Sequence, residues 1–257
     1  AVEKWAQKRE ELEKKTRKNS FVNNIIRIKK FSLIIFFVPL IAVNICLIIV
    51  SYFGEYLNHG DALGSPSFPY IDGETSISRT ARVFPSYLVF KPCMILTGIV
   101  LINYWNTNYK LIKDLDPINN LKKYFRFFGV ASAIFIILHA IFLGIKFDLD
   151  IYKFFRRFIL LGFIIFELIA QAILVRNLNK IKNNIETLIS KKILKLKIIL
   201  VGLLILVALL SLPILGSSNY VEFKHALEWN YLVGILIFYL LNFYFWRKPL
   251  PHTLSGV

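Results

Sequence analysis

Six long hydrophobic runs constrain the fold of this chain more than any other feature of its sequence. Each run is about twenty residues long, which in an α-helix is enough to cross a hydrocarbon core of roughly 30 Å. The runs cover approximately residues 31–53, 83–105, 127–145, 158–175, 198–215 and 227–246. We therefore predict six membrane-spanning helices, with a long outer loop between the first and the second.

The composition agrees with this interpretation. The 257-residue chain is 56% hydrophobic and has a mean hydropathy of +0.57, which is more apolar surface than a soluble domain can bury. The predicted fold class is therefore all-α, a polytopic six-helix membrane bundle. Because lipid tails give no hydrophobic drive between helices, we expect packing to rely on small residues such as Gly129 and Gly202.

The runs divide the chain into three parts. Residues 1–30 form a basic N-terminal segment with ten Lys and Arg against four Glu. Glu10 and Lys14 lie four residues apart, a spacing that favours a helix, here over residues 3–18. Residues 31–246 make up the transmembrane domain, and residues 247–257 form a tail.

Lysine and arginine are distributed unevenly between the connecting segments. The segments that would share the side of the N-terminus carry 24 of the 32 Lys and Arg residues, and the alternate segments carry seven. This bias predicts cytoplasmic termini and an outer or luminal loop at residues 54–82, in an organelle that the sequence does not specify. Arg156 and Arg157 run against the bias, because they lie on the predicted outer side. Since the charge of +16 follows this topology, we expect membrane lipids rather than nucleic acid as partners.

The basic connector of residues 176–197 carries apolar residues at helical spacing. These residues are Leu178, Ile181, Ile185, Leu188 and Ile189. On one helix they would form an apolar face suited to an anionic cytoplasmic leaflet. The alternative is that the segment extends spans four and five. This connector and the N-terminal helix are also the possible docking surfaces for protein partners.

Standard catalytic and metal-binding motifs do not occur in the sequence. It contains no HExxH, GxSxG, phosphate-binding loop or CxxC. The two cysteines, Cys46 and Cys93, lie inside hydrophobic runs without other metal ligands nearby in the sequence. We therefore predict no metal site and no cofactor, assign no catalytic residue, and leave open whether the protein is an enzyme.

Charged and hydroxyl residues gather at the predicted outer face. Arg79 and Arg82 are three residues apart and would share a helix face, and arginine forks bind phosphate in a bidentate manner. The candidate lipid-headgroup residues are Arg79, Arg82, Lys91, Asp72, Ser76, Ser78, His225 and Glu228. The alternative is an ion pair from Arg79 or Arg82 to Glu228 that fixes the loop to the bundle.

Three polar residues lie where the runs are expected to be deep in the bilayer. Glu167 is near the middle of run four, with Gln171 one turn further on the same face. A carboxylate at that depth costs about 2.5–3.5 kcal/mol on insertion scales, so it must face other helices or water, or stay protonated. His139 in run three is the expected partner. The pair would handle protons or bind a headgroup, or else form an interhelical hydrogen bond.

Short segments in three places suggest a family. They are Phe68-Pro-Tyr-Ile71 and Ser76–Pro85 in the first loop, Asn103-Tyr-Trp-Asn106 in run two, and Ala226–Tyr231 with Asn242 and Phe243–Trp246 in run six. Together they resemble the Frag/DRAM/Sfk superfamily, most closely its post-GPI-attachment lipid-remodelling branch.

This resemblance implies lipid handling, either the remodelling of a GPI-type anchor or the maintenance of membrane lipid distribution. The headgroup would then be contacted at the outer face. Two other functions fit the sequence. One is a structural or accessory subunit of a larger membrane complex, and the other is a small transporter that uses His139, Glu167 and Gln171.

Overall fold

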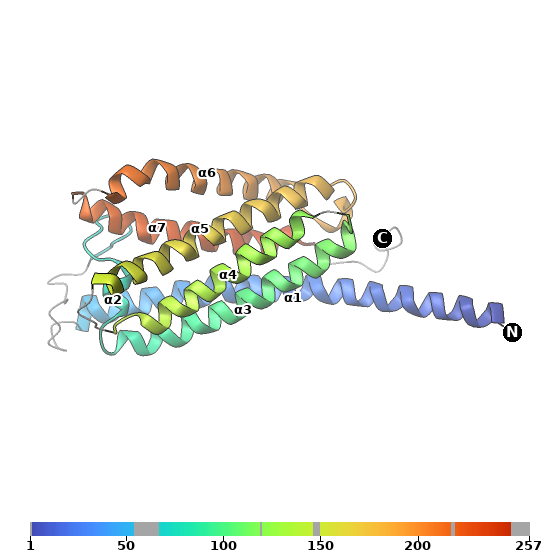
Figure 1. Cartoon of the computed structure of the whole chain (residues 1–257), viewed down its shortest axis with the longest axis horizontal. Helices are drawn as coiled ribbons and strands as arrows, with labels where there is room; N and C mark the ends of the chain where they lie inside the picture. The colour runs from blue at the N-terminus through green and yellow to red at the C-terminus, as the bar shows by residue number, and fades with distance from the viewer. Residues whose placement is uncertain (1, 54–66, 119, 146–149, 217–218, 248–257) are drawn as a thin grey trace.

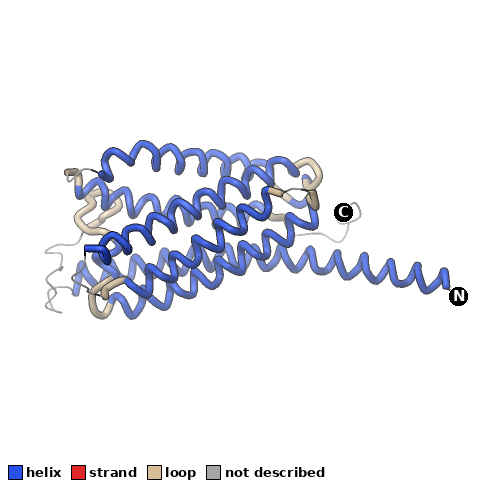
Figure 2. The backbone as a smooth tube through the Cα atoms, viewed as in Figure 1, coloured by secondary structure: helices blue, strands red, loops and turns tan. Residues whose placement is uncertain are grey.

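The computed structural model describes residues 2–53, 67–118, 120–145, 150–216 and 219–247. Within these ranges the chain forms helices and no strand, as Figure 2 shows. The six long helices are α1 (Val2–Phe53), α3 (Ser86–Leu115), α4 (Leu121–Phe142), α5 (Asp150–Ile181), α6 (Lys191–Gly216) and α7 (Val221–Phe245). Of the predicted tail, only Arg247 is among the described residues.

Each long helix contains a stretch that is apolar and long enough to cross a membrane. The six spans confirm the predicted fold class and identify an integral, multi-pass membrane protein. The helices run side by side in one bundle (Figure 1). We call the end where α1 stops and α3 starts the loop end, and the opposite end the N-terminal end. The short helix α2 (Ile77–Ala81) lies at the loop end.

Helix α1 joins two predicted elements into one. The sequence suggested a separate helix over residues 3–18, but α1 is continuous for 52 residues and projects well beyond the bundle (Figure 1). The candidate span within it begins at Asn19. The hydrophobic run thus determines where α1 enters the bundle, while the charged residues before it extend the same helix.

Helix α6 is the most peripheral span. Only 22% of its most apolar stretch is buried, against 39–44% for the other five spans. It packs on α5 and α7, and beyond the exposed lysines of its first turns its remaining surface is apolar. Exposed side chains on this surface include Leu196, Ile199, Leu203, Leu206, Leu209 and Leu210. An apolar surface of this kind is what a helix at a lipid boundary requires.

The connector between α5 and α6 is not one amphipathic helix. Helix α5 continues to Ile181, a 3-10 turn covers Glu186–Leu188, and α6 begins at Lys191, so the segment extends the two flanking spans. Its predicted apolar face is buried inside the protein, not on a membrane surface. The backbone N–H of Ser190 donates to the carbonyl oxygen of Phe245 (3.0 Å), which ties the connector to the end of α7.

Close helix packing occurs at Gly129 but not at Gly202. A Cβ atom added at Gly129 of α4 would lie 2.3–2.5 Å from the buried indole ring of Trp105 on α3. At Gly202 of α6, no atom lies within 4 Å of such a Cβ. Gly129 therefore allows α3 and α4 to approach, whereas the expectation that Gly202 serves helix packing was wrong.

Candidate functional site

The described part of the first loop, residues 67–85, crosses the loop end of the bundle. Asp72 closes a turn there, because its carboxylate accepts hydrogen bonds from the Ser67 hydroxyl (3.0 Å) and the Phe68 backbone N–H (2.6 Å). The Glu74 backbone N–H adds a third at 3.0 Å. Burial acts to raise the pKa of Asp72, but these hydrogen bonds outweigh it and hold the pKa below its ordinary value.

Uncharged hydrogen bonds attach this loop to α7. The Nδ1 atom of His225 lies 2.9 Å from the carbonyl oxygen of Gly73, and the Trp229 indole N–H donates to the carbonyl oxygen of Thr75 (2.9 Å). Gly73 has a φ of 65°, and a Cβ atom there would lie 1.8 Å from the carbonyl oxygen of Glu222. Only glycine fits this approach of loop and helix.

The hydroxyls of the predicted headgroup site lie at the start of α2. Ser76 caps this short helix by accepting a hydrogen bond from the backbone N–H of Arg79 (3.2 Å). Its Oγ atom also lies 3.2 Å from the Oγ atom of Ser78. The Ser76 hydroxyl therefore caps α2, whereas Ser78 lines a hollow between the loop, α4 and α5.

A basic hollow opens between the loop, α4 and α5. Its volume is about 270 Å³, and we call it the basic hollow. Its walls are formed by Ser78, Arg82, His139, Leu143, Arg156, Arg157 and Leu160. Arg156 is half-buried, and its buried Nε atom has no hydrogen-bond partner among the described residues. Neither Arg156 nor Arg157 forms an ion pair with a described carboxylate, although the Arg156 guanidinium lies over the ring of Tyr152 at 5.3 Å.

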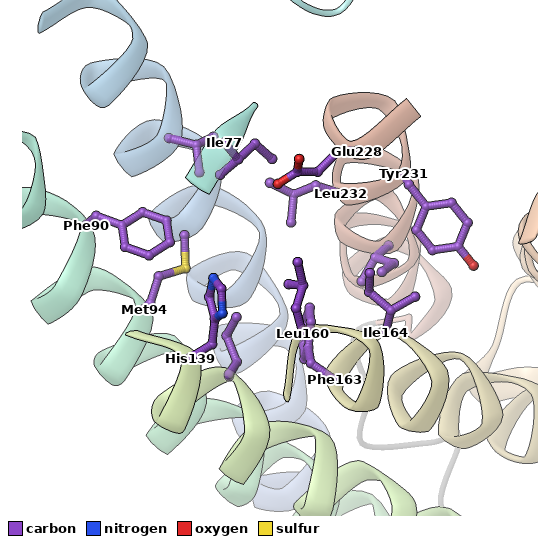
Figure 3. Close-up of a pocket in the computed structure, with 13 residues that line it drawn as sticks. Ile77, Phe90, Met94, His139, Leu160, Phe163, Ile164, Glu228, Tyr231 and Leu232 are labelled. Carbon is purple, nitrogen blue, oxygen red and sulfur yellow. The ribbon is translucent and has the colours of Figure 1, made fainter. Parts of the chain in front are cut away.

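An apolar chamber of about 60 Å³ adjoins the basic hollow and shares His139 and Leu160 with it. Figure 3 shows the chamber between α3, α4, α5 and α7, with the carboxyl group of Glu228 at one side and the His139 ring at another. The other lining residues are apolar apart from Tyr231. The hollow and the chamber together form a site with a cationic mouth and an apolar interior.

The three cations predicted for headgroup binding lie in different places. Arg82 lines the basic hollow, but Arg79 and Lys91 do not. The Lys91 ammonium donates to the carbonyl oxygen of Ile141 at 3.3 Å. No ion pair joins Arg79 to Glu228 in the described structure. The Glu228 carboxyl group instead accepts a hydrogen bond from the Ser78 backbone, and together with His225 and Trp229 of α7 it fixes the loop.

Sequence reasoning missed Arg156 and Arg157 as site residues. They lie at the start of α5, about seventy-five residues from Arg82 in the chain, and only the packing of α5 beside the loop joins the three. The sequence offered one indication: both arginines lie in a connector on the predicted outer side, where Lys and Arg are few. A cation that departs from the charge bias can thus mark a site.

The three intramembrane polar residues do not form one group. Glu167 and Gln171 are fully buried, and the Gln171 amide donates to Glu167 Oε1 at 3.0 Å. The other hydrogen-bond partners of this carboxyl group are the hydroxyls of Ser132 of α4 (2.6 Å) and Tyr239 of α7. His139 is not a partner of Glu167, because it lies about two helical turns from Ser132 and faces the hollow and the chamber.

A second buried polar group lies towards the N-terminal end. The Lys197 ammonium is fully buried and donates to Asn242 Oδ1 at 2.7 Å. It also lies over the rings of Phe238 (4.3 Å) and Phe245 (5.0 Å). The aromatic faces supply the negative potential that a carboxylate would otherwise provide. Nothing in the sequence pattern distinguished Lys197 from the other lysines of this connector.

Comparisons with known proteins do not assign a function. No protein-family model, curated protein or solved structure matches the chain. The superfamily suggested by the short segments of the first loop and the last run therefore remains a proposal. The six apolar helices place the chain among integral, multi-pass membrane proteins.

Proposed function

We propose that this protein handles membrane lipids and binds a phosphate-bearing headgroup in the basic hollow. The supporting observation is the half-buried Arg156, whose Nε atom lacks a partner among the described residues, beside Arg82 and Arg157. Buried polar groups are normally hydrogen-bonded, so an unpartnered guanidinium nitrogen in a concave site points to a ligand acceptor.

The chemistry of the site favours a phosphate group over a carboxylate. Three guanidinium groups line the basic hollow, and each can present a planar fork to two oxygen atoms. The Ser78 hydroxyl adds a further hydrogen bond at the same wall. A phosphate accepts from several such forks at once, and its negative charge suits a wall of guanidinium groups.

The apolar chamber explains why the ligand would be a lipid. It adjoins the phosphate position through His139 and Leu160 and offers apolar walls for the part of the ligand next to the headgroup. A site with apolar walls and a few oriented polar groups is the usual form of a small-molecule pocket. The finer proposals are the two that the resemblance implies: remodelling of a GPI-type anchor lipid, or maintenance of lipid distribution. We also propose the predicted orientation, in which both termini are cytoplasmic and the hollow faces outside or a lumen.

Lipid retention by purified protein tests this proposal. We would exchange the protein into detergent with equal amounts of phosphatidylinositol and diacylglycerol, which lacks the phosphate, and measure bound lipid by native mass spectrometry. We expect the wild type to retain phosphatidylinositol selectively and the Arg156→Gln/Arg157→Gln variant to lose it. Arg79→Gln is the matched control, because Arg79 belongs to the same face of the bundle but does not line the hollow. Equal retention by the wild type and the double variant would refute the proposal.

A second candidate function is an accessory subunit of a membrane complex. The observation that favours it is the projection of α1 beyond the bundle, with Trp5 74% exposed (Figure 1). The connector between α5 and α6 is a weaker docking surface than expected, because its apolar residues are buried. A partner that co-purifies in fixed ratio, and is lost when residues 1–18 are deleted, would support this function. Purification of the intact chain without such a partner would exclude it.

A further inference from the structure

The hydrogen bonds around the buried carboxyl group of Glu167 indicate whether it carries a proton, once donors and acceptors are counted. Its Oε1 atom accepts from the Gln171 amide (3.0 Å) and from the Tyr239 hydroxyl. Its Oε2 atom lies 2.6 Å from the Oγ atom of Ser132. The Ser132 Oγ atom also lies 2.8 Å from the carbonyl oxygen of Gly129, which can only accept.

A serine hydroxyl has a single proton to donate. If Ser132 donates to Gly129, the short contact between Ser132 Oγ and Glu167 Oε2 requires a proton on the carboxyl group. In that arrangement Oε1 is the carbonyl oxygen with two donors, Oε2–H donates to Ser132, and each of these contacts has one donor and one acceptor. A protonated Glu167 therefore accounts for the whole set of contacts.

The surroundings of Glu167 provide no positive charge that would keep it ionised. From α1 it is approached by Ile35 and Pro39, and from α4 by Ser132. The titratable groups that face it are Tyr104 of α3 and Tyr239 of α7, both neutral hydroxyls. The buried cation of helix α6, Lys197, donates to Asn242. A neutral carboxyl group is what such an interior stabilises.

The same site also contains what an ionised Glu167 would need. The Tyr104 hydroxyl and the Trp105 indole N–H are buried and have no hydrogen-bond partner among the described residues. The Tyr104 hydroxyl lies close enough to interact electrostatically with the Glu167 carboxyl group, and the Trp105 indole N–H lies close enough to donate to it. Donors beside the carboxyl group can stabilise the negative charge that remains when the proton leaves. A proton-binding site needs such donors, whereas a fixed structural bond does not.

Three adjoining cavities lead from Glu167 to the loop end. The innermost, of about 20 Å³, is lined by Glu167 and Tyr239 and has room for one water molecule. It shares wall residues, among them Ile136 and Leu232, with the apolar chamber. The chamber in turn adjoins the basic hollow at His139.

We propose that Glu167 is a proton-binding site that exchanges its proton with water at the loop end through these cavities. Loading transfers one proton from hydronium in the basic hollow to Glu167 Oε2, and unloading returns it to water there, while the Tyr104 and Trp105 donors beside the carboxylate stabilise its charge. The inference does not depend on lipid binding in the hollow.

Infrared spectroscopy of the protein in lipid nanodiscs tests it directly. A protonated carboxyl group has a C=O stretch distinct from that of a carboxylate. We expect such a band in the wild type, its shift in D₂O, and its replacement by carboxylate absorption as pH rises. In a Glu228→Gln background, which removes the second buried carboxyl group of the chamber, Glu167→Gln should remove the band, and Glu186→Gln, the control at an exposed carboxylate, should retain it. Gln keeps an acceptor and a donor where the protonated acid has them, so the variant should fold.

The other outcomes overturn the proposal. Absence of a protonated band assignable to residue 167 would show that the carboxyl group is ionised, and a band that neither exchanges in D₂O nor responds to pH would show a fixed structural bond. If Glu167→Gln does not fold, Glu167→Asp makes the same assignment by moving the band. Leu232→Phe, which adds volume where two cavities meet, should slow the D₂O shift several-fold, and an unchanged rate would refute the proposed route.

Discussion

Substituting alanine at Gly129 and at Gly202 should have opposite effects on stability, although both glycines lie in membrane-spanning helices. At Gly129 the new Cβ atom would lie 2.3–2.5 Å from three atoms of the Trp105 ring. Since unstrained carbon contacts are about 3.5–4.0 Å long, the ring or the helix must move by about 1–1.5 Å. Trp105 is fully buried between Tyr104 and Phe125, so it has little freedom to move.

The expected magnitudes follow from this geometry. Overpacking a core costs about 1–3 kcal/mol, and a rigid buried ring places Gly129→Ala at the upper end of that range. The better helix propensity of alanine offsets about 1 kcal/mol of this cost. We therefore expect the free energy of unfolding to fall by about 2 kcal/mol. At Gly202 no atom lies within 4 Å, so only the favourable change remains, up to about 1 kcal/mol.

Reversible unfolding in mixed micelles, followed by tryptophan fluorescence and circular dichroism, measures both free energies of unfolding. A double-mutant cycle adds a specific check, because Gly129→Ala should cost less in a Trp105→Leu background, where the ring is absent. Equal effects of the two alanine substitutions, or no coupling between residues 129 and 105, would refute the packing argument.

Two other predictions concern polar groups that the bundle and loop hold in place. Lys197→Met should lower the free energy of unfolding by about 1–3 kcal/mol because it leaves Asn242 Oδ1 buried without its donor, whereas Lys197→Met/Asn242→Leu should restore most of the loss. Unfolding in mixed micelles measures both, and a double variant worse than the single one would contradict the reasoning. At the loop, Asp72 has a pKa held below its ordinary value, so its contribution to loop stability is present above the ordinary pKa of about 3.9 and is lost as pH falls through the lower folded-state value. The protection of the Phe68 and Glu74 amides against hydrogen exchange, taken relative to intrinsic exchange at each pH, should therefore fall in acid, and the Asp72→Asn variant should lack this acid-dependent step.

The membrane-spanning architecture could be predicted because its causes are local. A hydrophobic run of sufficient length can satisfy its own backbone hydrogen bonds only as a helix inside a bilayer, so each span follows from its own residues. The errors lay in the polar segments. Residues 178–195 have a helical apolar pattern. Ile185 and Ile189, however, lie in the short turns between α5 and α6, and their side chains are buried inside the protein. The pattern indicated burial correctly and did not indicate what would cover it.

The candidate site was predicted in part. The first loop and the start of α7 do meet, as the sequence suggested, and Arg82 lies at a concave basic site. The roles of individual residues were not predictable, because hydrogen bonds to the backbone occupy His225 and Asp72, and neither backbone partner has a sequence signal. Arg156 joined the site only through the position of α5.

Sequence alone determined that this chain has six spans, a basic N-terminal helix and a polar loop, because hydrophobic length and charge are properties of contiguous residues. The tertiary structure decided how each helix is rotated and which residues face one another. It placed Glu167 against Ser132 and Tyr239 rather than His139, and it made Gly129 a contact and Gly202 a surface position. Those choices depend on side-chain packing between helices far apart in the chain, and periodicity within one helix carries no information about them.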